Sequence, residues 1–252
     1  MRKLDRSEYR SVLPLIDRSS PGCVYPLSVA EGTQPGEIYS EGNSFIIHHH
    51  CGFAFVCGDR SPSVFESVYR AFLSPESAPA RRFLLFAGEQ EAELFKGRDG
   101  IRLEKRLFFE YRCGSIPQPR ALPDGFELRK IDPVLTGSIR GRITPSFSWD
   151  SAERFIEKGS GFCLTEGETP AAWAFSAAVS SEETDIGAET DERFRRRGFA
   201  AAAAEAMIKD ILSAGKRPVW ACHYQNTASV RLAESLGFEM AKGCITIRKS
   251  SL

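Results

Sequence analysis

The sequence has no long apolar run, no excess of charge of either sign and no two cysteines with only two residues between them. Its apolar stretches fall far short of the about 20 residues that a helix needs to cross a bilayer, which argues against contact with a membrane core. Lysine and arginine number 33, and aspartate and glutamate also number 33, so no field of the whole molecule attracts nucleic acid or an anionic membrane. The first ten residues lack the apolar core of a signal peptide, and we therefore expect a cytoplasmic protein.

The residues that most often bind metals are also poorly placed to do so. The seven cysteines are scattered, mostly within apolar runs, which predicts buried reduced thiols and no zinc framework. His48, His49 and His50 are adjacent, but only His48 and His50 would share a face of a strand, so at most two imidazoles converge. We expect solvated strand histidines and no metal site.

The composition is that of a globular protein, with 42% hydrophobic and 26% charged residues, in a length that fits one large domain or two ordinary ones. Residues 114–125 contain three prolines and two glycines, which disfavour both a helix interior and a central strand. We interpret this segment as a linker between an N-terminal α/β domain, residues 1–113, and a second domain, residues 126–252.

The first half reads as a small α/β unit. Ser61 and Pro62 are typical of a helix start, and apolar residues then recur at helical spacing up to Phe72. Strand-like segments rich in Phe, Ile, Val and Tyr flank this helix. We expect a structural or acceptor-shaping role and suspect a degenerate copy of the second half, although no sequence repeat is visible.

The second half predicts a meander followed by a long helix. Strand-like segments at residues 161–165, 171–179 and 184–190 are separated by polar turns, and residues 199–213 form an alanine-rich helical segment that Gly215 ends. This order predicts an α/β (α+β) fold, in which a mixed sheet carries helices on its faces.

The turn before this helix has the features of an anion site. Arg195, Arg196 and Arg197 precede Gly198, and a helix that starts there points unpaired N–H groups and the positive end of its dipole into the turn. Glycine lets the backbone approach a bulky oxyanion, and arginine binds phosphate well. The spacing has neither the three glycines of the dinucleotide fingerprint nor the Gly-Lys-Ser/Thr ending of a Walker loop.

The pattern Arg195-x-x-Gly198-x-Ala200 resembles the coenzyme A pyrophosphate loop of the GNAT superfamily of N-acetyltransferases. Downstream, Asn226 and Ser229 open a helical segment that ends in Leu-Gly-Phe at residues 236–238, as in the other wall of the coenzyme groove of that superfamily. The resemblance covers about half of the chain, from residue 126 onward, and is greatest to a bacterial subgroup of acetyltransferases. It implies a mostly antiparallel GNAT sheet and acetyl-CoA as co-substrate.

The resemblance also assigns roles to residues. It implies that the fourth strand of the domain parts from the fifth, with the pantetheine arm and thioester along Ala188, Glu189 and Thr190. The residues that it places on the coenzyme are Ala188, Glu189, Thr190, Arg195, Arg196, Arg197, Gly198, Phe199, Ala200, Asn226 and Ser229.

Two acids are candidates for the general base that deprotonates the attacking amine. Asp185 occupies the position where family members often carry a catalytic glutamate, and Glu189 lies within the strand. Alternation would place both on one face, whereas a bulge, common in this strand of the family, would break that parity. A chain of water molecules is a third possibility.

The usual proton donor is missing, since Ala233 stands where many relatives carry tyrosine. His223 and Tyr224 are nearby in sequence, and we interpret both as structural. Some relatives without that tyrosine are active, because a thiolate leaves readily near neutral pH.

Trp149 and Trp173 are candidates for contact with the acceptor, with core packing as the alternative. The predicted function is acetyl-CoA-dependent acetylation of a primary amine, favoured as that of a small molecule. Two alternatives stay open: an acyl-CoA-binding regulatory module without catalysis, and a protein or peptide N-acetyltransferase. RNA binding through the arginines is disfavoured, because no aromatic stacking platform accompanies them.

Overall fold

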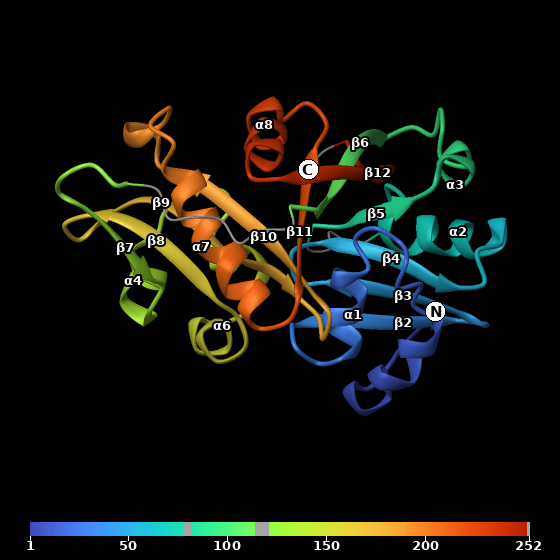
Figure 1. Cartoon of the computed structure of the whole chain (residues 1–252). Coiled ribbons are helices and arrows are strands. Elements are labelled where there is room, and N and C mark those ends of the chain that lie inside the picture. Colours follow the sequence, from blue (N-terminus) through green and yellow to red (C-terminus); the bar gives the residue numbers. More distant parts are fainter. Residues whose placement is uncertain (78–81, 114–120, 251–252) are drawn as a thin grey trace. The chain divides into compact units, whose positions relative to one another are not determined.

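The computed structural model describes residues 1–77, 82–113 and 121–250, and its elements form two compact units (Figure 1). Unit 1 comprises Met1–Phe108, Cys222–Asn226 and Met240–Leu252, and unit 2 comprises Phe109–Ala221 and Thr227–Glu239. The C-terminal residues thus group with unit 1, whereas the expected division assigns them to the second domain. Most of the expected linker, residues 114–120, lies outside the described residues.

Unit 1 is a sheet with short helices. Its elements are β1 (Arg2–Lys3), η1 (Arg6–Leu15), α1 (Val24–Ala30), β2 (Gly36–Glu41), β3 (Ser44–His49), β4 (Phe53–Gly58), α2 (Pro62–Val68), η2 (Tyr69–Leu73), β5 (Leu84–Ala87), α3 (Glu89–Glu93) and β6 (Ile101–Tyr111). Strands β1 to β4 pair antiparallel in sequence order, β4 pairs parallel with β5, and β5 pairs antiparallel with β12 (Phe238–Lys249). The last strand of the chain therefore completes the sheet of the first unit.

The predicted helix of unit 1 begins at Pro62, with Ser61 before it in extended conformation. The apolar face of this helix is buried in one core with β5 and consists of Val64, Phe65 and Val68. The helical spacing of these three residues places them on the same face of the helix. The expected helix up to Phe72 ends in a π-helical turn, η2, instead of continuing as a regular α-helix.

Unit 2 contains the end of β6, from Phe109, followed by β7 (Phe126–Lys130) and the predicted meander. Its other elements are α4 (Pro133–Ser138), α5 (Pro145–Ser148), α6 (Ala152–Lys158), β8 (Gly161–Glu166), β9 (Thr169–Val179), β10 (Glu183–Thr190), η3 (Glu192–Phe194), α7 (Phe199–Ser213), β11 (Arg217–His223) and α8 (Thr227–Ser235). The strands lie in the order β11, β10, β9, β8, β7, antiparallel except for the parallel pair of β10 with β11. Helix α7 spans the residues that the alanine-rich pattern predicted.

The two halves repeat one order of elements. Each has a strand, a helical segment, a three-stranded meander, a helix, a strand parallel to the last meander strand, a helix and a final strand. This confirms the expectation that the first half is a degenerate copy of the second. The two halves share the order of their elements and the pairing of their strands, and not a visible pattern of residue types. The repeat therefore cannot be seen in the sequence.

The sheet of unit 2 has a different core on each face. Trp173 and Phe175 of β9 pack with Trp149 and Phe155, while Ala172 of the same strand faces the core that contains Phe199 of α7. Alternation along β9 produces this division. The small residues toward α7 let that helix approach the sheet closely.

The histidine prediction was wrong, because His48 and His49 are 3% and 0% exposed. Ile46 and Ile47, on opposite faces of β3, belong to two different cores that contain residues of α2 and of α1, so neither face of this strand is open to solvent. The His48 ring contacts Phe83, and its Nε2 lies 2.9 Å from the carbonyl oxygen of Arg82. The His49 ring packs edge-on against Tyr25.

No helix of the described residues is long and apolar enough to span a bilayer.

The thiols are largely buried, as predicted, and none forms a disulfide in the described part of the chain. Burial raises the pKa of Cys57, Cys163 and Cys244 to about 12, so these thiolates form only at strongly alkaline pH. Cys113 is exposed.

We therefore expect iodoacetamide at pH 8 to alkylate Cys113 of the native protein long before Cys57, Cys163 or Cys244. Peptide mass spectrometry at timed intervals measures the order, and unfolding in urea should make the rates similar. Equal rates in the native protein would contradict the described burial.

Candidate functional site

Strands β10 and β11 separate after a short paired stretch. The parallel pairs join Glu183 with Arg217, Thr184 with Pro218 and Asp185 with Val219, and within the described residues no further pair joins the two strands. Strand β10 continues to Thr190 with β9 alone as its neighbour. Residues 186–190, called the parted stretch below, therefore present an edge inside the sheet, where backbone groups need another partner.

A bulge lies where the parting begins. Asp185 is paired with Ala178 and Ile186 with Ser176, so Ala177 of β9 is the extra residue. The bulge was expected in β10 itself, whereas its extra residue lies on the neighbouring strand β9. Beyond it, Gly187 lies against Phe175, whose ring atoms would be 3.0 Å from an added Cβ. A side chain at position 187 would therefore have to displace this ring.

The arginine-rich turn follows the parted stretch directly. Arg196 has φ of +65°, which makes it the one described residue other than glycine with positive φ, and Gly198 has φ of +77°. Backbone strain of this kind is concentrated at functional sites. Helix α7 begins at Phe199 without a side-chain cap, so its first N–H groups point into the turn. An ideal Cβ at Gly198 would meet nothing within 4 Å, which leaves room for a ligand against the backbone.

The charges of this turn are only partly neutralised. Arg195 forms an ion pair of 3.3 Å with Glu192, and all three arginines are exposed. The Arg197 guanidinium lies over the rings of Phe126 and Phe199, at 4.9 and 4.7 Å from their centroids. Neither Arg196 nor Arg197 forms an ion pair with a residue that the structure describes. The aromatic rings hold Arg197 in place and leave its charge available to an anion.

Glu189 is held by backbone groups from a distant segment. Its Oε2 accepts the N–H groups of Arg142 and Ile143, at 2.8 and 2.7 Å. The Trp173 indole N–H donates to the carbonyl oxygen of Ile143 at 2.7 Å. Side chains of β9 and β10 thus hold both sides of residue 143, and residues 141–143 are called the clamped loop below.

Gly141 permits this arrangement, because an added Cβ would lie 2.5 Å from Glu189 Oε2 and 2.7 Å from the Trp173 ring. The sequence interpretation missed the clamped loop. The sequence contains one signal for this loop, a glycine beside Arg142 in an otherwise helical region. The sequence does not show that Glu189 is the residue to which the loop binds.

Asp185 differs from Glu189 in its surroundings. It is 3% exposed and lies within the paired part of β10, before the bulge, whereas Glu189 is half-buried in the parted stretch. Of the two candidate bases, Glu189 is the one beside the opening between the strands.

Both predicted acceptor-contacting tryptophans are core residues. Trp149 and Trp173 are 2% and 1% exposed, and the Trp149 indole N–H donates to the carbonyl oxygen of Ser176 at 2.8 Å. Their contact with an acceptor stays a prediction. In this structure their rings shape the face of the sheet that carries Glu189.

The predicted coenzyme residues at the second helix divide between the units. Ser229, on α8, accepts a hydrogen bond from the Trp220 indole N–H at 3.0 Å. Asn226 belongs to unit 1, where its backbone N–H donates to the carbonyl oxygen of His223. Ala233 is fully buried in α8, so a tyrosine would not fit there without repacking.

Unit 1 contains a closed counterpart of the parting. Strands β4 and β5 also share three parallel pairs, from Phe53 with Leu84 to Phe55 with Phe86. The Arg60 guanidinium then donates to the Val56 carbonyl oxygen and to Glu91 Oε1, both at 2.8 Å. Helix α2 begins with a proline, which has no N–H to offer a ligand. The candidate site is therefore the parting in unit 2.

Comparison with known proteins gives one family. A family model described as GNAT acetyltransferase matches residues 26–245. The [Ribosomal protein bS18]-alanine N-acetyltransferase of Escherichia coli K12 is 30% identical over 106 residues, which are 42% of this chain and 66% of the relative, just under two thirds of its length.

Two solved structures share the fold over nearly the whole chain. A GCN5-related N-acetyltransferase-like protein from Streptococcus suis has a TM-score of 0.73 at 20% identity, covering 96% of this chain and 98% of that one. A tandem GNAT protein from the clavulanic acid biosynthesis pathway has a TM-score of 0.59 at 11% identity, covering 98% and 97%. At these identities the similarity shows the fold alone.

We expect replacement of Glu189 by alanine to release the clamped loop. Two N–H groups would lose a charged acceptor, and the free energy of unfolding should fall by about 1–3 kcal/mol. Urea denaturation measures the loss, and hydrogen exchange at Arg142 and Ile143 should quicken. Glu189→Gln, whose amide oxygen can accept both bonds, is the matched control and should be nearly as stable as the natural protein.

Proposed function

The chain belongs to the GNAT acetyltransferase family, and we propose that it transfers the acetyl group of acetyl-CoA to a primary amine at the parted stretch of unit 2. The observation that carries this proposal is the end of the β10–β11 pairing at Asp185, directly before a turn with open N–H groups and exposed arginines. The sequence continues from one feature into the other, so a ligand with a diphosphate and a long polar arm can use both.

The turn fits a diphosphate. Its positive φ angles at Arg196 and Gly198, the open space over Gly198 and the N-terminus of α7 together form an anion-binding concavity. Arg195, Arg196 and Arg197 would add charge, while Phe199 and Ala200 would supply the first helical N–H groups. Ser229 and Asn226 remain candidates for further contacts with the coenzyme.

The parted stretch fits an amide-containing arm, because Ala188, Glu189 and Thr190 have a strand on one side only. Acetyl-CoA would supply an acetyl thioester there. The backbone at Ala188 is suited to donate a hydrogen bond to a developing oxyanion. In the reaction the amine nitrogen bonds to the carbonyl carbon, the carbon–sulfur bond breaks, the amine loses one proton to a base and the thiolate gains one.

We assign the base to Glu189 in preference to Asp185. The clamped loop uses Oε2 of Glu189, so a proton would be accepted by Oε1, and the carboxylate is fixed in orientation. Asp185 is buried on the paired side of the bulge and would have to act through water. Because residue 233 is alanine, the thiolate of coenzyme A takes its proton from solvent in this proposal.

We favour a small-molecule amine as acceptor. A second candidate, a protein amine, is favoured by the E. coli relative, whose name describes acetylation of an alanine of a ribosomal protein. Thiol release from acetyl-CoA, measured with a panel of small primary amines and with peptides that begin with alanine, distinguishes the two. Coenzyme binding without thiol release for any acceptor would favour the regulatory module.

We expect Gly198→Val to weaken coenzyme A binding at least ~tenfold. A β-branched residue at φ of +77° is strained by about 1–2 kcal/mol and would occupy the space over the turn. Gly215→Val is the matched control, because Gly215 has φ of +72°, also meets nothing within 4 Å, and lies at the other end of α7. Calorimetry showing equal affinity for both variants would exclude the turn as the diphosphate site.

We expect Glu189→Gln to lower kcat by roughly 10²–10⁴-fold, the usual contribution of a general base, with little change in coenzyme affinity. The clamped loop should persist, since glutamine can accept the same N–H groups. Steady-state kinetics and calorimetry separate the two quantities. An unaffected Glu189→Gln with an inactive, folded Asp185→Asn would move the base to Asp185.

A further inference from the structure

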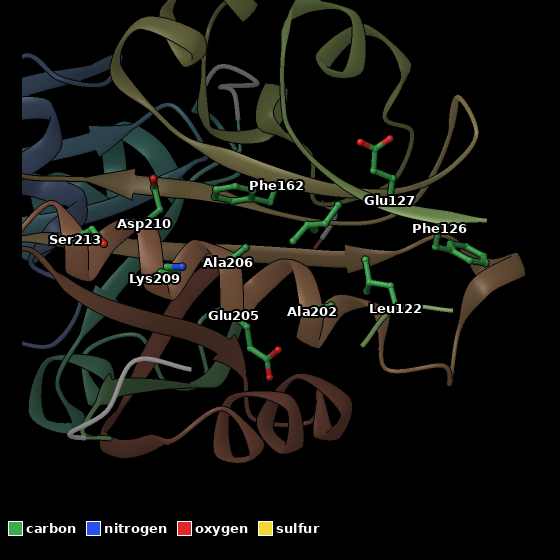
Figure 2. Close-up of a pocket in the computed structure, with 11 residues that line it drawn as sticks. Leu122, Phe126, Glu127, Phe162, Ala202, Glu205, Ala206, Lys209, Asp210 and Ser213 are labelled. Carbon is green, nitrogen blue, oxygen red and sulfur yellow. The ribbon is translucent and has the colours of Figure 1, made fainter. Parts of the chain in front are cut away.

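The side chain of Glu189 lies on the face of the sheet opposite α7. Glu189 of β10 is the direct pair of Trp173 of β9, so their side chains are neighbours on one face. The other face carries α7 and a pocket of about 640 Å³ that is lined by Phe126, Phe162 and residues of α7 (Figure 2). Neither Glu189 nor Trp173 lines this pocket. The contacts that orient the proposed base are therefore on the face away from α7.

The carboxylate of Glu189 is held by one of its two oxygens. Oε2 has two lone pairs, and it accepts the N–H groups of Arg142 and Ile143. Hydrogen bonds to an ionised carboxylate are stronger than those between neutral groups, so two of them on one oxygen restrict its rotation. Oε1 accepts no hydrogen bond from a residue that the structure describes. Oε1 is therefore the oxygen left to take the proton of the amine.

Trp173 holds the clamped loop at a second backbone group. Ile143 donates its N–H to Glu189, and its carbonyl oxygen accepts the Trp173 indole N–H at 2.7 Å. The peptide planes on both sides of Ile143 cannot rotate without breaking one of these bonds. The indole N–H is the one polar group of a tryptophan side chain. Phenylalanine at position 173 would therefore keep an aromatic ring in the core and lose the bond to the loop.

Gly141 contributes to this arrangement because it has no side chain. An added Cβ would lie 2.5 Å from Glu189 Oε2 and 2.7 Å from the Trp173 ring. Both distances are too short for a carbon atom, so alanine at position 141 would displace the carboxylate, the ring or the loop.

We propose that Trp173 and Gly141 are positioning residues, which fix the direction in which Oε1 of Glu189 faces the amine. This inference rests on the proposed function. Neither residue gives or takes a proton, and both act through the clamped loop. A displacement of about 1 Å can cost on the order of 10²-fold in rate, so loss of either contact should lower turnover. Coenzyme affinity should change little, because the arginine-rich turn is not altered.

The first test compares two glycines. Gly141→Ala should lower kcat about tenfold or more, with little change in coenzyme A affinity measured by calorimetry. Gly137→Ala, on α4, is the matched control, because an added Cβ there meets nothing within 4 Å and Gly137 lies outside the clamped loop. It should keep the natural kcat. Equal kcat values for the two variants would exclude Gly141 as a positioning residue.

The second test asks whether Trp173 acts through Glu189. Trp173→Phe should lower kcat about tenfold or more in the natural protein, and hydrogen exchange at Ile143 should quicken. In the Glu189→Gln protein, which has no base left to misplace, the same substitution should change kcat less than ~twofold. A purely structural tryptophan would reduce kcat by one factor in both proteins, and that result would overturn the inference while the proposed function stands.

The remaining outcomes concern the proposed function. Absence of thiol release from acetyl-CoA by the natural protein, with any amine, would overturn the proposed function. Full activity of Glu189→Gln would overturn the assignment of the base, and the positioning roles with it. If Trp173→Phe does not fold, Gly141→Ala replaces it in the comparison with Glu189→Gln.

Discussion

Among the described residues, strand β10 pairs beyond Asp185 with β9 alone, and the backbone groups of residues 186–190 that face away from β9 must find partners outside the sheet. Buried or half-buried peptide groups cannot remain unpaired without a cost comparable to a lost hydrogen bond. An extended molecule with its own donors and acceptors satisfies them as a further strand would. The arginine-rich turn then extends this edge into an anion site, so polar arm and diphosphate can be bound by consecutive residues of one chain segment.

Polar contacts, and not only apolar packing, shape the surroundings of this edge. Glu189 and Trp173 hold the N–H and the carbonyl of Ile143 from two adjacent strands. Fixing a loop by its backbone leaves little freedom for the carboxylate, and a group fixed in this way needs no reorganisation before it acts. The same contact thus contributes to stability and to the orientation of the proposed base.

The repeated architecture shows how one topology can be open or closed. Both halves separate a parallel strand pair after three residue pairs. In unit 1 the Arg60 side chain donates to Val56 of β4 and to Glu91 of α3, while Pro62 removes an N–H at the helix start. In unit 2 the turn before α7 contains Gly198 and exposed arginines instead. A few side chains, and not the fold, make the surroundings of the two partings different.

The sequence by itself determined the features that depend on near neighbours. The boundaries of α7, the strands of the meander, the start of α2 at Pro62 and the glycine at the arginine-rich turn all follow from backbone preferences within a few residues. Only the tertiary structure decided which distant segments meet. The bond from Arg142 to Glu189 spans 47 positions. The burial of His48 and His49 results from cores on both faces of β3, and β12 pairs with β5 of unit 1. Such contacts depend on the whole set of competing pairings, which no local pattern records.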